Sequence, residues 1–184
     1  MIQLETVVIS ANKNETNRLE APIVVHVMTP KLFENTNSVC LAQGLSFQPG
    51  LRVETNCQNC GFQQVRINGL DGPYTQLLLD GKALFSSLNG VYGIEQIPTG
   101  MIERVEVMRG GGSALYGANA IGGTVNIITK EPLNNLFMIS HNLTAIGNSA
   151  YDNTTSLNTS LVNSQRDAGI YLFGTSRHRQ HYDH

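Results

Sequence analysis

Residues 109–130 read RGGGSALYGANAIGGTVNIITK, and this stretch is the most informative part of the chain. The segment SALYGANA predicts a helical turn, and glycines frame it on both sides. A run rich in branched residues, IERVEVMRG, leads into it, and a second such run, GTVNIITK, follows it. Both runs predict β-strands. The chain up to Lys130 is therefore predicted to be a mixed α+β domain with a small sheet and short helices.

Further short strands are predicted upstream of this stretch. LRVET, QQVRING and TQLLLDG are short and rich in branched residues. The pairs Asn68-Gly69 and Asp80-Gly81 predict tight turns, because asparagine, aspartate and glycine tolerate positive φ. The glycine-rich loop after Arg109 could cradle a phosphate at a helix start, but it lacks the lysine and the glycine spacing of nucleotide-binding loops. A structural turn is the favoured interpretation.

Two helices are predicted in the N-terminal half. A strand at 23–28 is followed by Thr29-Pro30, where the threonine hydroxyl can cap a helix and proline suits its first position. Ser38 is predicted to cap a second helix that runs to about Phe47 and ends at Pro49-Gly50.

The texture of the sequence changes after Pro132. Three extended runs come next, LFMISHNLTAI, TTSLNTSLV and AGIYLFGTS, separated by polar turns. Runs of this kind are typical of outer-membrane barrel strands, and the alternative is an ordinary antiparallel meander. A closed barrel needs at least about 8 strands, so the chain is expected to be a fragment of a longer protein. One side of the pleat is predicted to carry Phe137, Ile139, Leu143, Leu157 and Leu161.

Composition argues against several functional classes. The chain has 184 residues, 41% of them hydrophobic, which is enough for one modest core. Its formal net charge of −2 gives no basic field for phosphate backbones, so no nucleic-acid partner is expected. No apolar run approaches the roughly 20 residues of a membrane helix, and no secretory leader opens the chain. No Ser/His/Asp arrangement is suggested, so no catalytic residues, metal or cofactor are predicted.

The segment from Arg109 to Lys130 closely resembles the end of the plug domain in TonB-dependent outer-membrane receptors. Other pieces keep the family's order: ETVVISA at Glu5 to Ala11, then LSFQPGLRV, QVRINGLDG, LLLDG and IPTGMIERVEVMRG. The likeness covers about Glu5 to Pro132, and the residues after Pro132 look like the opening strands of the barrel. Receptors for vitamin B12, haem and siderophores share this layout. One departure is a glycine where the family usually has a proline after Arg-Gly.

The resemblance implies a division of the chain into three parts. Residues 1–19 would form a TonB box and linker, residues 20–132 the plug, and residues 133–184 the first strands of a truncated transmembrane barrel. The full barrel would have about 22 strands, with the plug in its lumen, in the outer membrane of a Gram-negative cell. The implied function is energy-coupled uptake of a scarce nutrient, such as an iron chelate, haem or cobalamin, rather than catalysis.

The implied protein partner is TonB in the periplasm. An unpaired strand presents free N–H and C=O groups to which another strand can add. The alternative is an N-terminal strand that is already paired within the domain. The residues expected to bind TonB are Glu5, Thr6, Val7, Val8, Ile9, Ser10 and Ala11.

Three loops match positions where plugs of this family face the extracellular vestibule: Asn56 to Phe62, Pro73-Tyr74 and Phe85 to Gly93. Aromatic side chains there could give flat contact area, while asparagine and serine orient a ligand through hydrogen bonds. Packing beneath the loops is the alternative for each aromatic residue. The residues expected to bind ligand are Asn56, Gln58, Asn59, Phe62, Tyr74, Phe85, Ser86, Asn89 and Tyr92.

Cys57 and Cys60 in NCQNCGF allow three interpretations: a redox motif, half of a zinc site, or a structural disulfide. Redox chemistry favours a cysteine at a helix start, and zinc needs two more ligands. In the oxidising periplasm that the resemblance implies, a local disulfide between Cys57 and Cys60 is expected. Cys40 lies apart, in a stretch predicted to be helical.

Charged residues alternate with apolar ones along the predicted strand IERVEVMR. In a soluble domain this pattern marks a solvated face. Inside a barrel the same face meets a polar wall, where weak ion pairs could hold a movable plug. The residues expected to contact the barrel are Glu103, Arg104, Glu106 and Arg109.

Two functions from other classes compete with this interpretation. A soluble periplasmic binding or adhesion module would make the three final runs an ordinary meander. A thiol oxidoreductase would depend on Cys57 and Cys60.

Overall fold

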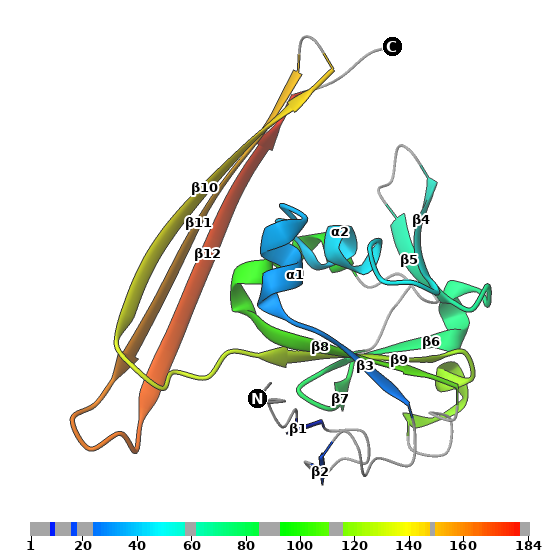
Figure 1. Ribbon diagram of the computed structural model, residues 1–184, viewed down its shortest axis with the longest axis horizontal. Helices are drawn as coiled ribbons and strands as arrows, with labels where there is room; N and C mark the ends of the chain where they lie inside the picture. The colour runs from blue at the N-terminus through cyan, green and yellow to red at the C-terminus, as the bar shows by residue number, and fades with distance from the viewer. Residues whose placement is uncertain are drawn as a thin grey trace, which may run out of the picture.

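The computed structural model describes residues 8–9, 16–17, 24–57, 62–84, 93–110, 116–147 and 150–180. These residues form an α/β body, between Val24 and Lys130, and an outer sheet of three long strands that curves past one side of the body (Figure 1). The predicted α+β domain followed by antiparallel strands is confirmed. No helix among the described residues is long and apolar enough to cross a membrane.

A five-stranded mixed sheet forms the centre of the body. Its strand order is β3-β8-β9-β6-β7, with β9 parallel to β6 and the other neighbours antiparallel. Val105, Val107, Val125 and Ile127, on the two central strands β8 and β9, are fully buried, so the branched runs that predict these strands also supply the core. The strands span Val25–Met28 (β3), Thr75–Leu79 (β6), Lys82–Ala83 (β7), Ile102–Arg109 (β8) and Gly123–Thr129 (β9).

Two short helices lie over this sheet: α1 (Pro30–Asn35) and α2 (Leu41–Leu45) (Figure 1). Pro30 begins α1 as predicted, although the Thr29 hydroxyl makes no capping hydrogen bond. The prediction that Ser38 caps the second helix is wrong, because Cys40 occupies the N-cap position. α2 also ends at Leu45, short of the predicted end.

The late start of α2 has a backbone cause. The Leu41 N–H donates to the Ile97 carbonyl at 2.9 Å, and the Thr99 N–H donates to the Val39 carbonyl at 3.2 Å. These bonds hold residues 39–41 against residues 97–99. The Ser38 hydroxyl is meanwhile engaged with the Thr36 hydroxyl at 2.7 Å, so it is not available for capping.

A β-hairpin, β4 (Leu51–Cys57) with β5 (Phe62–Ile67), rises from the body. Both predicted turn pairs have positive φ throughout, 53° and 83° at Asn68-Gly69 and 48° and 74° at Asp80-Gly81. The Asp80 carboxylate fixes its turn by accepting hydrogen bonds from the backbone N–H and the hydroxyl of Thr129, both at 2.9 Å.

Single helical turns complete the body. Of the predicted helical turn in SALYGANA, the described residues contain helical Tyr116 and η4. Among the described residues the 3-10 turns are η1 (Gly72–Tyr74), η2 (Ile94–Gln96), η3 (Thr99–Met101) and η4 (Ala118–Ala120).

The outer sheet consists of β10 (Leu136–Ile146), β11 (Ala150–Val162) and β12 (Gly169–Arg179). Its register opposes Ile139 to Leu157 and Leu161 to Ile170. Strand pairing also joins β1 (Val8–Ile9) to β2 (Thr16–Asn17).

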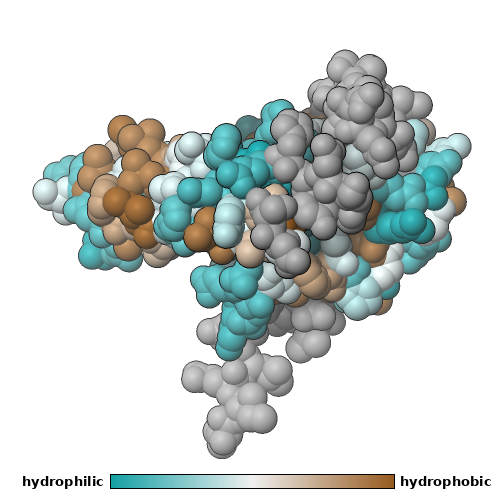
Figure 2. Space-filling model, turned by 90° about the horizontal axis from the view of Figure 1, so that it is seen from above, coloured by the Kyte–Doolittle hydropathy of each residue, from teal (hydrophilic) through white to brown (hydrophobic). Residues whose placement is uncertain are grey.

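The two faces of the outer sheet differ in chemistry. The face turned away from the body carries the predicted apolar row, joined by Ile170 and Leu172 of β12, and hydrophobic side chains gather over this part of the surface (Figure 2). The opposite face of β11 is polar, and the body covers it. On that face Asp152, Thr154, Asn158 and Ser160 are at most 8% exposed.

Candidate functional site

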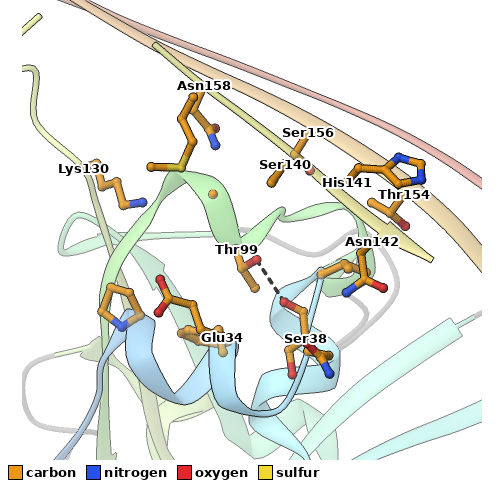
Figure 3. Close-up of a pocket in the computed structure, with 16 residues that line it drawn as sticks. Glu34, Ser38, Thr99, Lys130, Ser140, His141, Asn142, Thr154, Ser156 and Asn158 are labelled. Carbon is orange, nitrogen blue, oxygen red and sulfur yellow. Dashed lines mark hydrogen bonds between the residues drawn. The ribbon is translucent and has the colours of Figure 1, made fainter. Parts of the chain in front are cut away.

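A cavity of about 250 Å³ separates α1 from the outer sheet (Figure 3). The body contributes α1, the connection after it, η3 and Lys130, and the outer sheet contributes β10 and β11. The lining from the sheet is dominated by hydroxyl and amide groups. The labelled lining residues are Glu34, Ser38, Thr99, Lys130, Ser140, His141, Asn142, Thr154, Ser156 and Asn158.

A second cavity, of about 440 Å³, lies beside the α1–α2 connection. Gln43 and Phe47 line it from the body, while Thr144 and Asp152 line it from the outer sheet. Between the two cavities the body therefore meets the sheet across hydrogen-bonding groups and open space, not through a tightly packed apolar seam. Such an interface is easily hydrated.

Lys130 and Glu34 place opposite charges at one end of the first cavity (Figure 3). Burial lowers the pKa of the Lys130 amine, and the negative charges of Glu34 and Glu103 oppose that shift. Lys130 lies directly after β9, where the chain continues to the outer sheet. Its backbone N–H donates to the Met101 carbonyl at 2.9 Å.

One contact across the interface is close. The Tyr171 hydroxyl donates to the Gly100 carbonyl at 2.9 Å. A Cβ on Gly100 would lie 2.8 Å from both the oxygen and the nitrogen of the Asn158 side-chain amide, so a side chain at position 100 would require that amide to move. η3 is therefore fixed against the outer sheet.

An ion pair lies on the polar face of the outer sheet. The Arg177 Nε donates to both carboxylate oxygens of Asp152, at 3.0 and 3.2 Å, and its Nη2 donates to Oδ2 at 2.5 Å. The sequence prediction missed this pair. Charged residues at inward positions of two neighbouring strands are a usable signal, but only once the register between the strands is known.

The four residues expected to contact a barrel are engaged within the body. Arg104 lies 2.9 Å from a carboxylate oxygen of both Glu103 and Glu106. A β-bulge between Ile102 and Arg104 interrupts the alternation there. The Glu103 side chain is 47% exposed and that of Glu106 is fully buried. A wholly solvated face is therefore not observed.

Arg109 binds inside the body as well. Its Nη2 donates to the Pro49 carbonyl. Its guanidinium lies 2.8 Å from the place that a Cβ on Gly50 would take, and Gly50 has a φ of +80°. Arg109 thus fixes the turn between α2 and β4. Whether any of these four residues also contacts a barrel stays a prediction.

The residues expected to bind ligand are only partly within the described chain. Asn56 and Phe62 lie in β4 and β5, at the free end of the hairpin, which points to the same end of the molecule as the β10–β11 connection and away from β1 and β2 (Figure 1). Tyr74 is 45% exposed but lies in η1 beyond the base of the hairpin, where its carbonyl accepts from the Gly122 N–H. The structure does not bring Tyr74 to the hairpin end. Gln58, Asn59, Phe85, Ser86, Asn89 and Tyr92 lie outside the described residues.

The cysteine predictions stay open. Cys57 ends β4, whereas Cys60 lies outside the described residues, so their disulfide is untested. Cys40 is a buried free thiol. In the part of the chain that the structure describes, no three histidine, cysteine or acidic side chains gather as a metal site would require.

Two residues of the expected TonB-binding segment are described. Val8 and Ile9 form β1 and pair with Asn17 and Thr16 of β2. Within the described chain this pairing lies outside the five-stranded sheet. Glu5, Thr6, Val7, Ser10 and Ala11 lie outside the described residues.

Comparison with known proteins identifies close relatives of the body. The family model described as "TonB-dependent Receptor Plug Domain" matches residues 17–124. The vitamin B12 transporter BtuB of Vibrio vulnificus is 35% identical over 127 residues, which cover 69% of this chain and 21% of that protein. BtuB of Vibrio cholerae is 31% identical over 126 residues. The chain thus spans about a fifth of the length of these curated relatives, which are transporters and not enzymes.

Solved structures extend the likeness to the outer sheet. The siderophore receptor PirA from Acinetobacter baumannii superposes with a TM-score of 0.65 and 26% identity, over 83% of this chain and 24% of that one. The FpvAI–pyocin S2 complex gives a TM-score of 0.73 over 92% of this chain and 22% of that one; at 19% identity it supports the fold alone.

Proposed function

Because the chain belongs to the TonB-dependent receptor plug family, we propose that it supplies the plug and the first wall strands of an outer-membrane receptor that imports a scarce nutrient with energy from TonB. We assign the TonB box and linker to residues 1–19, the plug to residues 20–132 and the first barrel strands to residues 133–184. The plug closes the lumen until the receptor is loaded and TonB acts on it.

The observation that carries this proposal is the two-sided chemistry of the outer sheet. Its apolar face, with Phe137, Ile139 and Leu157, is turned away from the body and suits lipid. Its polar face covers the plug through hydroxyl and amide groups. Strands of a transmembrane barrel need this division, because one face meets hydrocarbon and the other meets a hydrated lumen. A soluble module gains nothing from so large an exposed apolar face.

The nutrient class is inferred from the relatives and from the hairpin. Relatives of the plug include vitamin B12 transporters, and structural neighbours include siderophore receptors, so cobalamin and iron chelates lead the candidates, with haem as a third. We propose that the ligand contacts the end of the β4–β5 hairpin, at Asn56, Gln58, Asn59 and Phe62, and the loop with Phe85, Ser86, Asn89 and Tyr92. A Cys57–Cys60 disulfide would stiffen that hairpin. Tyr74 belongs to the same proposal but is the weaker candidate, because it lies in η1, away from the hairpin end.

TonB is proposed to bind the segment from Glu5 to Ala11 by strand addition. Pairing of Val8 and Ile9 with β2 supports this, because a strand in a two-stranded ladder keeps one edge to which a further strand can add. Ligand bound at the hairpin would favour release of the segment, so that TonB engages loaded receptors. An unchanged accessibility of a label at position 8 upon ligand addition would contradict this coupling.

Uptake by the receptor that carries this chain tests the proposal. In a receptor-deficient strain, cyanocobalamin, haemin and a ferric siderophore are each supplied in labelled form, with and without TonB. We expect TonB-dependent uptake of one of them, lost in Val8→Pro because proline cannot complete a strand ladder. Asn14→Pro, in the polar stretch after the segment, is the matched control. Uptake that continues at the same rate without TonB would refute the proposed function.

A further inference from the structure

The β4–β5 hairpin carries different residues on its two faces. It forms a two-stranded sheet apart from the five-stranded one, and one face of its base packs into the core through Leu51, Val65 and Ile67. Apolar packing is not directional, so the direction in which the hairpin points depends on the contacts of its other face. The residues on that polar face of the base are Arg52, Glu54, Gln64 and Arg66.

Glu54 lies between two arginines on this polar face. Its carboxylate oxygens are 2.9 Å from the Arg66 Nε and 3.2 Å from the Arg52 Nε. Arg52 and Arg66 oppose each other in the register of the hairpin, so Glu54 offsets the repulsion between them. The contact with Arg66 acts through charge, because its Nε–H does not have hydrogen-bond geometry toward the carboxylate.

Arg66 also reaches out of the hairpin. Its Nη2 lies 2.5 Å from a carboxylate oxygen of Asp71, the N-cap residue of η1. The Arg66 side chain is 32% exposed and that of Arg52 is 77% exposed, and within the described chain Arg52 forms an ion pair with Glu54 alone. A planar guanidinium can contact two carboxylates at once, so Arg66 joins the hairpin to η1 and Arg52 does not.

The backbone of η1 lies against the same face of the hairpin. Gly72 is buried, and a Cβ there would lie 2.8 Å from the Gln64 Cβ and 2.9 Å from its Cδ. Because the Gln64 Cβ is fixed to the strand, a side chain at position 72 would push η1 and β5 apart. Gln64 and Arg66 are two residues apart and therefore share a face, so both contacts join the same two elements.

η1 is in turn attached to the central sheet. The Tyr74 carbonyl accepts a hydrogen bond from the Gly122 N–H at 2.8 Å. The next residues, Thr75 and Gly123, are partners in the parallel pairing of β6 with β9. The hairpin is thus joined, through η1, to two strands of the five-stranded sheet.

We propose that Arg66 is a positioning residue for nutrient binding: its contacts with Glu54 and Asp71 fix the direction of the β4–β5 hairpin relative to η1. The hairpin end, where the proposed ligand contacts lie, is thereby held in one place. Arg66 lies at the base, so it acts through the hairpin and not by touching the ligand. This inference rests on the proposed function for its ligand, but the direction of the hairpin can be measured without one.

A distance between the hairpin and the sheet tests the inference in the intact receptor. Spin labels are introduced as unnatural amino acids at Thr55 in β4 and Lys82 in β7, which are both exposed, and the cysteines stay unchanged. Pulsed electron paramagnetic resonance measures the distribution of distances between the labels. Arg66→Gln should broaden it. Arg52→Gln is the matched control, because Arg52 contacts the same carboxylate without reaching η1, and it should leave the distribution unchanged.

Asp71→Asn removes the partner on η1 alone. The Asp71 side chain makes no capping hydrogen bond, so this change should leave η1 itself intact. It should broaden the distance distribution as Arg66→Gln does. The double variant should broaden it no further, because both substitutions break the same contact.

Nutrient binding gives the second readout, with whichever of cyanocobalamin, haemin and a ferric siderophore the parent receptor binds. Arg66→Gln should raise the Kd about fivefold, the upper range for a partly exposed ion pair, and leave the maximal TonB-dependent uptake rate unchanged. Arg52→Gln should change neither quantity. A plug that was merely destabilised would instead lose maximal rate.

A parental distance distribution in Arg66→Gln would overturn the inference, and so would an unchanged Kd beside a broadened distribution. Heat-modifiable mobility in gels reports whether each barrel has folded. If Arg66→Gln does not fold, Asp71→Asn carries the same two measurements. Failure of the proposed function has a different signature, since the parent would then bind none of the three nutrients while the distances still report the contact between the hairpin and η1.

Discussion

Tyr171 of the outer sheet and Gly100 of the plug, 71 residues apart in sequence, are joined by a hydrogen bond of 2.9 Å from the phenol to the backbone carbonyl. Asn158 lies against the same glycine, where a Cβ would come within 2.8 Å of its amide. A backbone carbonyl is a contact that substitutions at position 100 cannot remove. What position 100 requires is instead a residue without a side chain, because the Asn158 amide occupies the space where a Cβ would lie.

Tyr171→Phe should lower the free energy of unfolding of the receptor by about 0.5–1.5 kcal/mol, the usual net value of one hydrogen bond. Tyr151→Phe is the control, because Tyr151 is 50% exposed on the opposite face of the outer sheet. Urea unfolding in detergent or lipid measures both. Gly100→Val should also destabilise the receptor, because its side chain would displace the buried Asn158 amide; an unchanged stability would contradict the close contact.

Glu106 and Glu103 offer a second matched pair, since both bind Arg104 at 2.9 Å. The Glu106 side chain is fully buried, so Glu106→Ala strands the arginine beside a buried gap and should destabilise the plug by about 3 kcal/mol or more. Glu103→Ala removes a half-exposed partner and should cost about 0–1 kcal/mol. Denaturant midpoints that fall equally for the two variants would show that burial of Glu106 does not matter.

The lowered pKa of the Lys130 amine predicts how the stability of the receptor depends on pH in the alkaline range. Burial lowers the pKa of its amine below the ordinary value of 10.5, so in the window below 10.5 the unfolded chain binds more protons than the folded one. Stability contributed by this group therefore rises as pH rises through that window. Wild-type receptor should therefore gain stability relative to Lys130→Gln as the pH is raised toward 10.5. A stability difference that stays constant, or that moves the other way, would contradict the assignment.

Two neighbouring residues of β11 should respond differently when each is replaced by arginine. Leu157 is 43% exposed on the apolar face, whereas Ser156 lines the cavity on the plug side. Leu157→Arg should destabilise the folded receptor in lipid by about 2–4 kcal/mol if it lies near the bilayer midplane. Ser156→Arg should leave insertion into lipid intact, and it should instead weaken the packing of the plug against the outer sheet. Folding titrations in liposomes separate the two, and equal losses would argue against a lipid-facing side.

The strands were predictable because their signals are local. IERVEVMRG and GTVNIITK form β8 and β9, and the turns at Asn68-Gly69 and Asp80-Gly81 arise from residues that tolerate positive φ. The start of α2 was not predictable, because pairing of residues 39–41 with residues 97–99 overrides the local capping signal of Ser38.

The site was less predictable than the fold. Alternation along β8 indicated a charged face, but the burial of Glu106 depends on tertiary packing that the alternation does not contain. Arg109 pairs with Pro49 across 60 residues, and Arg177 pairs with Asp152 across 25, so neither partnership can be read from nearby sequence. The alternation of the last three strands predicted that the outer sheet has a polar face. The plug residues that lie opposite this face could be identified only from the tertiary structure.

The alternation of β11 makes this strand intolerant of changes in length. Its side chains point in turn to the plug and to the outside from Ala150 to Val162, without a bulge in its pairing with β10 or β12. Deletion of one residue in the middle of β11 would turn every later side chain of the strand to the opposite face, so that apolar residues would face the plug and polar residues the lipid. Homologues can therefore substitute residues within β11, whereas insertions or deletions in this strand must come in pairs to keep its two faces.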